Sequence, residues 1–192
     1  AMKSHHHPHP QSQLEVWLAE EARVLHTLNS GAGPGVARPE QVAGKSGLEV
    51  MQAMLQGELP YPPIAKTLDF MLISVGEGTA TFQGTPGVPH FNPMGTVHGG
   101  WFATLLDSAL GCAVHTRMPP GRAYPTAELS VNIVRALTPK VQRVRAIGRI
   151  IHCGRQLATA DAQLIGPDGT LYAHATTTCL VFEVKQPPAV QG

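Results

Sequence analysis

Apolar residues recur at helical spacing in two segments near the N-terminus. Residues 14–29 and 47–56 each place apolar side chains three or four positions apart, which is typical of an amphipathic helix. Glycine and proline interrupt this spacing at 31–39. Further prolines argue against regular structure throughout 57–66. The sequence therefore predicts two helices, with irregular chain between them and after the second.

A two-residue alternation, typical of β-strands, begins after Thr67. Residues 68–86 predict two strands joined at 76–78. Further strands are predicted at 123–136, 141–152, 156–166 and 170–183. In the first of these, one face carries Ala127, Leu129, Val131 and Ile133, and the other carries Thr126, Glu128, Ser130 and Asn132. The expected fold class is α+β, with one long helix at 99–116 wrapped by five or six mostly antiparallel strands.

The helix predicted at 99–116 is apolar around most of its circumference, so we expect it to be buried. At 100° per residue, a narrow stripe of small and polar residues lies within about 60° of Gly100. Its other members are Thr104, Asp107, Gly111 and His115. An ionised carboxylate at Asp107 is costly unless it is paired, hydrated or used in chemistry. Two interpretations stay open, a structural aspartate satisfied by a nearby hydroxyl or amide and a catalytic one.

Two glycines stand at the start of the same helix. The first amides of a helix lack internal partners, so those of Gly99 and Gly100 could hold a developing oxyanion. The alternative is a tight turn into the helix. Gly99 and Asp107 are eight residues apart, which is about 12 Å along a helix. If both act on one substrate, two chains must lie with these helices antiparallel, which predicts a two-fold dimer with two shared sites.

Composition and charge argue against several classes of partner. The chain has 192 residues, which fits one domain with an extension, and its formal net charge of +1 gives no general attraction to nucleic acid or anionic membranes. Its three cysteines lack a C-x-x-C spacing, which indicates reduced thiols. We expect a soluble cytoplasmic protein with a His-rich N-terminal tail. The histidines downstream lack the spacing of metal ligands, so no metal or other cofactor is expected.

Residues 91–111, "FNPMGTVHGGWFATLLDSALG", are similar to the signature of the PaaI-type hotdog-fold acyl-CoA thioesterases. In that family an N-x-x-G-x-x-H-G-G segment leads into the central helix, and an acid follows within the helix. The resemblance extends over about 46–184. It implies a hotdog fold and the hydrolysis of an acyl-CoA thioester to CoA and a carboxylate.

The resemblance also implies roles for five residues, matched by motif position. Asn92 takes the place of the asparagine that touches the thioester or its attacking water, and His98 that of the histidine that positions the loop. Gly99 matches the glycine whose N–H polarises the thioester carbonyl. Asp107 matches the catalytic acid, as nucleophile or general base. Thr126, after a variable loop, matches the hydroxyl residue that helps to hold the attacking water.

The phosphates of CoA are negatively charged, so a CoA-binding site is expected to contain basic residues. Arg143, Arg145 and Arg149 alternate along one predicted strand and form a candidate basic edge. The residues expected to bind substrate are Gly100, Arg135, His152 and Arg155. The alternative interpretation of these charges is a solvated strand face that protects a sheet edge.

The predicted organisation has three parts. Residues 1–45 form a His-rich tail and helical extension, 46–185 the hotdog domain, and 186–192 a C-terminal tail. Removal of residues 1 to about 40 is expected to leave fold and catalysis largely intact, because the signature lies beyond them. The expected partners are an acyl-CoA substrate and further copies of the chain, as a homodimer or homotetramer, without nucleic acid or membrane. Two other functions stay open, a non-catalytic acyl-CoA-binding or sensing module and a hotdog dehydratase.

Overall fold

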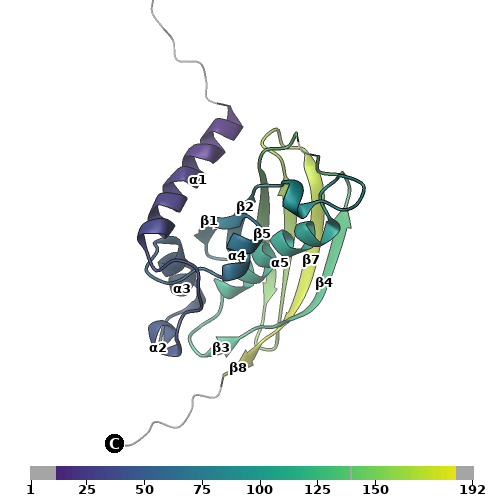
Figure 1. The fold of residues 1–192 in the computed structure, drawn as a ribbon. Coiled ribbons are helices and arrows are strands. Elements are labelled where there is room, and N and C mark those ends of the chain that lie inside the picture. The colour runs from purple at the N-terminus through teal and green to yellow at the C-terminus, as the bar shows by residue number, and fades with distance from the viewer. Residues whose placement is uncertain (1–11, 139, 185–192) are drawn as a thin grey trace, which may run out of the picture.

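Six strands form one antiparallel sheet that curls around a single long helix, α5 (Gly99–His115). In this computed structural model, which describes residues 12–138 and 140–184, the strand order is β1-β2-β5-β6-β7-β4. The strands are β1 (Phe70–Gly76), β2 (Thr79–Gly84), β4 (Thr126–Ile133), β5 (Val144–Cys153), β6 (Leu157–Ile165) and β7 (Leu171–Leu180). Figure 1 shows α5 lying across the inner face of this sheet, which confirms the predicted α+β fold.

The remaining elements are short or lie before the sheet. They are α1 (Gln13–Ser30), α2 (Pro39–Val42), α3 (Gly47–Leu55), α4 (Pro63–Thr67), η1 (Val88–His90), and the paired strands β3 (Arg122–Ala123) and β8 (Phe182–Glu183). Helices α1 and α3 confirm the two predicted N-terminal helices. Each begins with a capping box, from Ser12 to Glu15 and from Ser46 to Glu49, which satisfies amides at the helix start.

Two short helices lie where the sequence predicts irregular chain. Helix α2 occupies part of the segment between α1 and α3 and begins at Pro39. Residues 57–66 were expected to lack regular structure because of their prolines, but α4 begins within them at Pro63. Proline fits the first turn of a helix, where its missing N–H has no partner to lose and its fixed φ suits the helix. Among the described residues, no helix is long and apolar enough to cross a membrane.

The core lies between α5 and the inner face of the sheet. Helix α5 contributes Trp101, Phe102, Leu105, Leu106, Ala109, Leu110, Ala113 and Val114, all nearly inaccessible to solvent. Burial of each leucine contributes about 1.5–3 kcal/mol to folding. The sheet contributes mostly small side chains, which let the helix come close. At Gly148 on β5 an added Cβ would lie 2.2 Å from the carbonyl oxygen of Ala109, so this position requires glycine.

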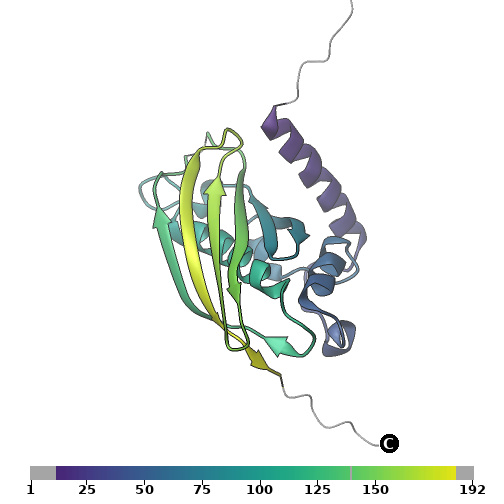
Figure 2. The ribbon, with the colours of Figure 1, turned by 180° about the vertical axis from the view of Figure 1, so that it is seen from behind.

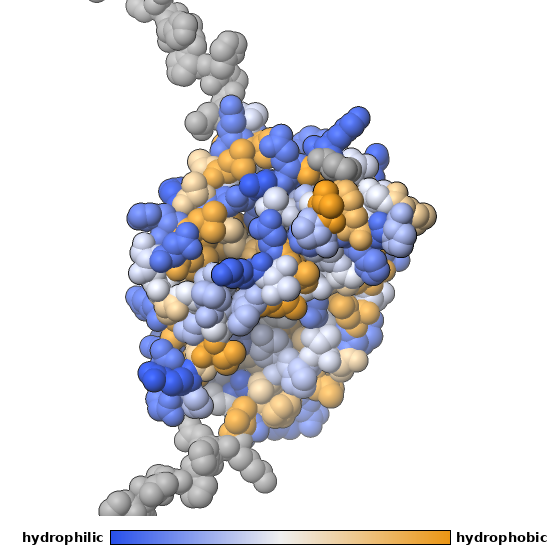
Figure 3. Space-filling model, in the orientation of Figure 1, coloured by the Kyte–Doolittle hydropathy of each residue, from blue (hydrophilic) through white to orange (hydrophobic). Residues whose placement is uncertain are grey.

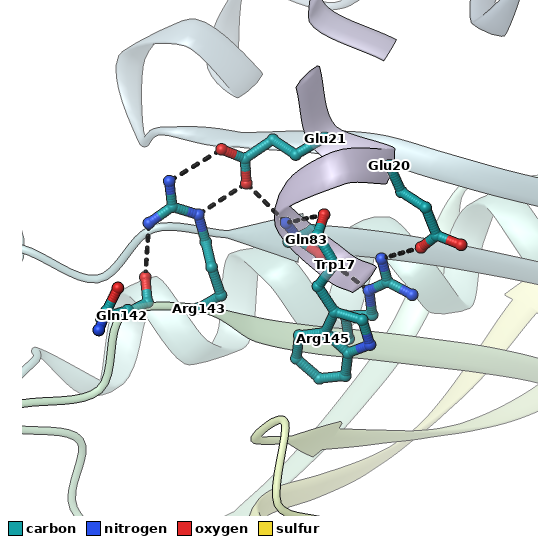
Figure 4. Close-up of polar contacts among 7 residues, drawn as sticks. All are labelled: Trp17, Glu20, Glu21, Gln83, Gln142, Arg143 and Arg145. Carbon is teal, nitrogen blue, oxygen red and sulfur yellow. Dashed lines mark hydrogen bonds and ion pairs between the residues drawn. The ribbon is translucent and has the colours of Figure 1, made fainter. Parts of the chain in front are cut away.

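Helix α1 packs on the opposite face of the sheet and is bound there by charged side chains (Figure 4). The view from behind in Figure 2 shows α1 on the side of β1 and β2, with β4 at the far edge of the sheet. Arg143 and Arg145 point away from α5, because Val144 and Ala146, which alternate with them, are buried in the core. Arg143 donates two hydrogen bonds to Glu21, of 2.6 and 2.8 Å, and Arg145 is paired with Glu20.

Uncharged groups complete the contact between α1 and the sheet. Gln83 of β2 donates to the Glu21 carboxylate at 2.6 Å and accepts from Arg145 Nε at 2.8 Å. The Arg145 guanidinium lies over the Trp17 ring, 4.5 Å from its centre, and Trp17 is only 4% exposed. Desolvation alone would raise the pKa of Glu21, but the hydrogen bonds from Arg143 and Gln83 outweigh it and hold that pKa below its usual 4.5.

These contacts correct the expectation of a basic edge at Arg143 and Arg145. Arg143 and Arg145 are neither a CoA-binding edge nor a solvated face, since both bind carboxylates of α1. The burial of Trp17 and Leu28 leads us to expect that removal of α1 destabilises the fold, in contrast to the expectation from the sequence.

Candidate active site

His98 caps the N-terminus of α5 and engages one of the two glycine amides there in a hydrogen bond. Its Nδ1 accepts a hydrogen bond of 2.8 Å from the N–H of Gly100. An acceptor nitrogen carries no proton, so a neutral His98 holds its proton on Nε2. Among the described residues, no partner is found for the N–H of Gly99. The free donor at this positive end of the helix dipole is therefore Gly99, and the amide of Gly100 is already engaged.

Asn92 braces the loop that leads to His98. Its Oδ1 accepts from the N–H of Met94 at 2.9 Å and of Thr96 at 3.3 Å, and its Nδ2 donates to Thr96 Oγ1 at 2.9 Å. One hydrogen on Nδ2 remains available. The first function of Asn92 in this structure is thus to hold the loop, and contact with a substrate would use the remaining hydrogen.

An open hollow of about 290 Å³ lies beside the start of α5 and brings together three predicted site residues. Its lining is Asn92, Thr96, Val97, Gly99, Phe102, Ile133, Val134, Arg135 and Ala136. Arg135, just after β4, is exposed there. A second hollow, of about 320 Å³, lies on the side of His98 and Gly100. The loop and the helix start thus separate the two hollows.

Asp107 lies on the outward stripe of α5 and is half-buried. Thr126 donates a long hydrogen bond of 3.4 Å from Oγ1 to Asp107 Oδ1. Desolvation raises the pKa of Asp107, and the bond from Thr126 opposes this only in part. Because a raised pKa makes a carboxylate a stronger base once it is ionised, the environment suits proton abstraction or nucleophilic attack.

A β-bulge brings Thr126 to Asp107. Thr126 pairs with Cys179 on β7, while Glu128 pairs with Thr178, so β4 contains one extra residue at this point. The extra residue shifts the alternation and turns Thr126 toward the helix, the side on which Leu129 packs against the core. The sequence pattern placed Thr126 on the opposite face from Leu129, and that prediction is wrong because of the bulge.

The proposed carbonyl donor and the proposed base do not meet within one chain. Gly99 and Asp107 are eight positions apart on α5, or about 12 Å at 1.5 Å per residue. Asp107 lines neither of the two hollows at the helix start. The separation expected from the sequence is therefore present in the folded chain.

Two of the predicted substrate-binding residues lie at the other end of the sheet. His152 and Arg155 are exposed near the connection from β5 to β6, and the Arg155 carbonyl accepts from Arg122 Nη1 at 3.0 Å. The register places that connection beside the start of β4, whereas Arg135 follows its end. One chain thus does not bring His152 and Arg155 to the hollow that holds Gly99 and Arg135.

Sequence reasoning missed two histidine contacts. His90 is buried and stacks on Trp101, with ring centres 5.4 Å apart and planes at 27°. His115 lies 5.2 Å from the Tyr124 ring, and burial lowers the pKa of His115 and raises that of Tyr124. His90 ends the three-residue helix η1, which is too short to show a periodic pattern, so the sequence pattern could not reveal it. Among the described residues, no group of three or more potential ligands could hold a metal ion.

Comparisons with known proteins agree with this architecture. The sequence model of the thioesterase superfamily matches residues 94–173. A candidate esterase from Halobacterium salinarum is 33% identical over 82 residues, which are 43% of this chain and 54% of that protein. The chain thus spans about half the length of this curated relative.

Solved structures match over a longer part of the chain. The phenylacetic acid degradation protein PaaI from Thermus thermophilus, solved as a point mutant, has a TM-score of 0.55 and 27% identity over 62% of this chain and 97% of its own. A candidate thioesterase related to phenylacetic acid degradation, from Ralstonia eutropha, has a TM-score of 0.62 and 28% identity over 67% and 97%. With its antiparallel sheet wrapped around one helix, this chain belongs to the thioesterase superfamily and has the hotdog fold.

Proposed function

We propose that this protein hydrolyses acyl-CoA thioesters at two sites, each shared between two protomers. The observation that carries the proposal is the pairing of a free N–H at Gly99 with a half-buried, basic carboxylate at Asp107, about 12 Å away on the same helix. Only a second chain, with its α5 antiparallel to the first, brings one group of each kind to the same substrate.

The reaction follows from the groups available. The thioester carbonyl accepts a hydrogen bond from Gly99 N–H, which stabilises the oxyanion that forms during attack. The partner's Asp107 takes a proton from a water molecule, and the water oxygen bonds to the carbonyl carbon. The tetrahedral intermediate then collapses to the carboxylic acid, the C–S bond breaks with its electron pair on sulfur, and the proton held by Asp107 passes to the CoA thiolate. Direct attack by Asp107, through an anhydride that water cleaves, is the other route that these residues allow.

The surface around the helix start supports a partner chain. Ile133 and Val134 line the hollow beside Gly99 and are 46% and 56% exposed, and Met94, in the loop before α5, is 85% exposed. Adjacent exposed apolar side chains can mark an interaction surface. The space-filling view shows apolar side chains among the polar ones on the side where α5 begins (Figure 3). The outward stripe of α5 is rich in small residues, so a second helix could approach it closely.

Arg135 is the best-placed residue for a phosphate of CoA, because it lies in the hollow that contains Gly99 and Asn92. Arg155 and His152 could serve the same purpose only if the partner chain carries them toward this hollow. The acyl group then extends from the carbonyl toward the partner's α5.

The decisive experiment measures release of the CoA thiol with a chromogenic thiol reagent, across short, medium, long and aryl acyl-CoAs. Turnover of at least one substrate, lost in Asp107→Asn, supports the proposal. Tight binding of acyl-CoA without release of thiol from any substrate would point to the non-catalytic sensing module. Loss of water from a 3-hydroxyacyl-CoA to give an enoyl-CoA, again without thiol release, would point to a dehydratase.

A further inference from the structure

His90 lies in the loop before α5 and contacts both residues that flank the glycine pair. Its carbonyl oxygen accepts a hydrogen bond of 2.8 Å from the N–H of His98. Its ring stacks on the Trp101 ring, with centres 5.4 Å apart. Gly99 and Gly100 therefore lie between two residues that one histidine holds, His98 through the backbone and Trp101 through the side chain.

Trp101, on which the His90 ring stacks, is itself held in place by burial and by two hydrogen bonds. Its side chain is only 3% exposed, and its Nε1 donates to the carbonyl oxygen of Leu68 at 2.8 Å. Its N–H donates to the carbonyl oxygen of His98 at 3.0 Å. The first turn of α5 is thus tied to the segment before β1, and the His90 ring lies against the indole that makes this tie.

The ring of His90 contributes through its shape in this site. His90 is 8% exposed, and its Nδ1 is buried without a hydrogen-bond partner among the described residues. A buried polar atom without a partner destabilises a fold, so a hydrogen bond at Nδ1 does not explain the position. One face of the ring, in contrast, stacks on Trp101.

We propose that His90 is a positioning residue for the N–H of Gly99, acting through its stack on Trp101. This inference rests on the proposed function, in which that N–H polarises the thioester carbonyl. Donor geometry matters because a carbonyl polariser acts on the oxyanion of the transition state, and a misplacement of about 1 Å can cost about 10² in rate.

Three variants test the proposal. His90→Ala removes the ring, and His90→Phe keeps a planar ring and removes the unpaired nitrogen. Val88→Ala, the control, alters a side chain in the same turn that is 76% exposed.

We expect His90→Ala to lower kcat about 10- to 100-fold with KM changed less than about threefold, since the loss falls on the transition state. His90→Phe should keep kcat within about threefold of the parent and raise Tm, because no unpaired polar atom stays buried. Val88→Ala should match the parent.

A second measurement needs no substrate. Hydrogen exchange at the backbone amides of residues 98–102 should be faster in His90→Ala and unchanged in His90→Phe. If the parent hydrolyses no thioester, the proposed function fails, while this exchange pattern still supports positioning. Loss of kcat in His90→Phe equal to that in His90→Ala would overturn the inference, because the imidazole nitrogens would then act in the chemistry. Parental kcat and exchange rates in a folded His90→Ala would overturn it as well.

Discussion

The Nδ1 atom of His98 accepts a 2.8 Å hydrogen bond from the N–H of Gly100, which leaves Gly99 as the free amide at the start of α5. The two adjacent glycines therefore differ in hydrogen bonding. The N–H of Gly100 is engaged in the cap, whereas no partner is found for the N–H of Gly99 in the part of the chain that the structure describes.

Gly99→Pro should remove this donor with little change to the fold. Gly99 is the first helical residue, where proline is well tolerated, and His98 before it has ψ 139°, which is compatible with a following proline. We expect kcat to fall about 10²–10³-fold, the usual cost of one lost oxyanion donor. Gly99→Ala keeps the N–H and serves as the control, with circular dichroism to check folding. Equal kcat in the two variants would show that the N–H is not used.

Mixed dimers of Gly99→Pro and Asp107→Asn chains should regain activity. If sites are shared, one site of a mixed dimer receives both defects and the other receives neither, so about half of the parental rate per mixed dimer returns. Sites contained within one chain would stay defective in every combination. The test requires two differently tagged chains, co-expressed and purified through both tags. Shared sites would be ruled out if the mixed dimer were no more active than the homodimers of the two variants.

Asp107→Asn should lose turnover while the protein stays folded. Loss of a general base typically costs about 10²–10⁴ in rate, and loss of a nucleophile at least as much. The matched comparison is Thr126→Val, which keeps the carboxylate, removes the hydroxyl that donates to it at 3.4 Å, and should reduce kcat less. Turnover of the asparagine variant within about threefold of the parent would remove Asp107 from the mechanism, since acid–base loss exceeds tenfold.

The raised pKa of Asp107 predicts two pH effects of known sign. Between its ordinary value of 3.8 and the raised value, the folded protein binds this proton more tightly than the unfolded chain does. The free energy of unfolding contributed by Asp107 therefore falls as the pH rises through that interval, and Asp107→Asn should lack this fall. The acid limb of kcat/KM should have its midpoint above 3.8, because the reaction requires the ionised carboxylate. Urea unfolding and kinetics over the same pH range measure both effects.

Deletion of residues 1–30 should destabilise the domain by several kcal/mol. The deletion takes away the buried side chains of Trp17 and Leu28, and burial of a large apolar side chain typically contributes about 1.5–3 kcal/mol. It also removes Glu21 and Glu20 from Arg143 and Arg145, but this loss adds little, because both arginines then become exposed to water. The comparison is a chain lacking only residues 1–11, which keeps α1 whole, with both measured by urea unfolding. Equal free energies of unfolding in the two truncated chains would show that α1 is a separable extension.

The same network predicts acid sensitivity of α1. Because the pKa of Glu21 lies below 4.5 in the folded protein, its contribution to stability is fully present above 4.5 and is lost as the pH falls through the lowered value. In Glu21→Gln this pH dependence should be absent. Proteolysis within α1 at graded acidic pH would follow the loss.

The sequence by itself determined the features that depend on neighbouring residues. Capping serines started α1 and α3, a two-residue turn joined β1 to β2, and periodic apolar positions marked α5 as buried. Even the separation of Gly99 from Asp107 followed from the rise per residue of a helix.

Only the tertiary structure decided which side chains meet across long stretches of chain. Arg143 binds Glu21, 122 residues away, and a bulge on the edge strand β4 turns Thr126 toward Asp107 against the alternation of its own sequence. The physical reason is that local periodicity shows which face a residue occupies, whereas packing of whole elements selects the partner on that face.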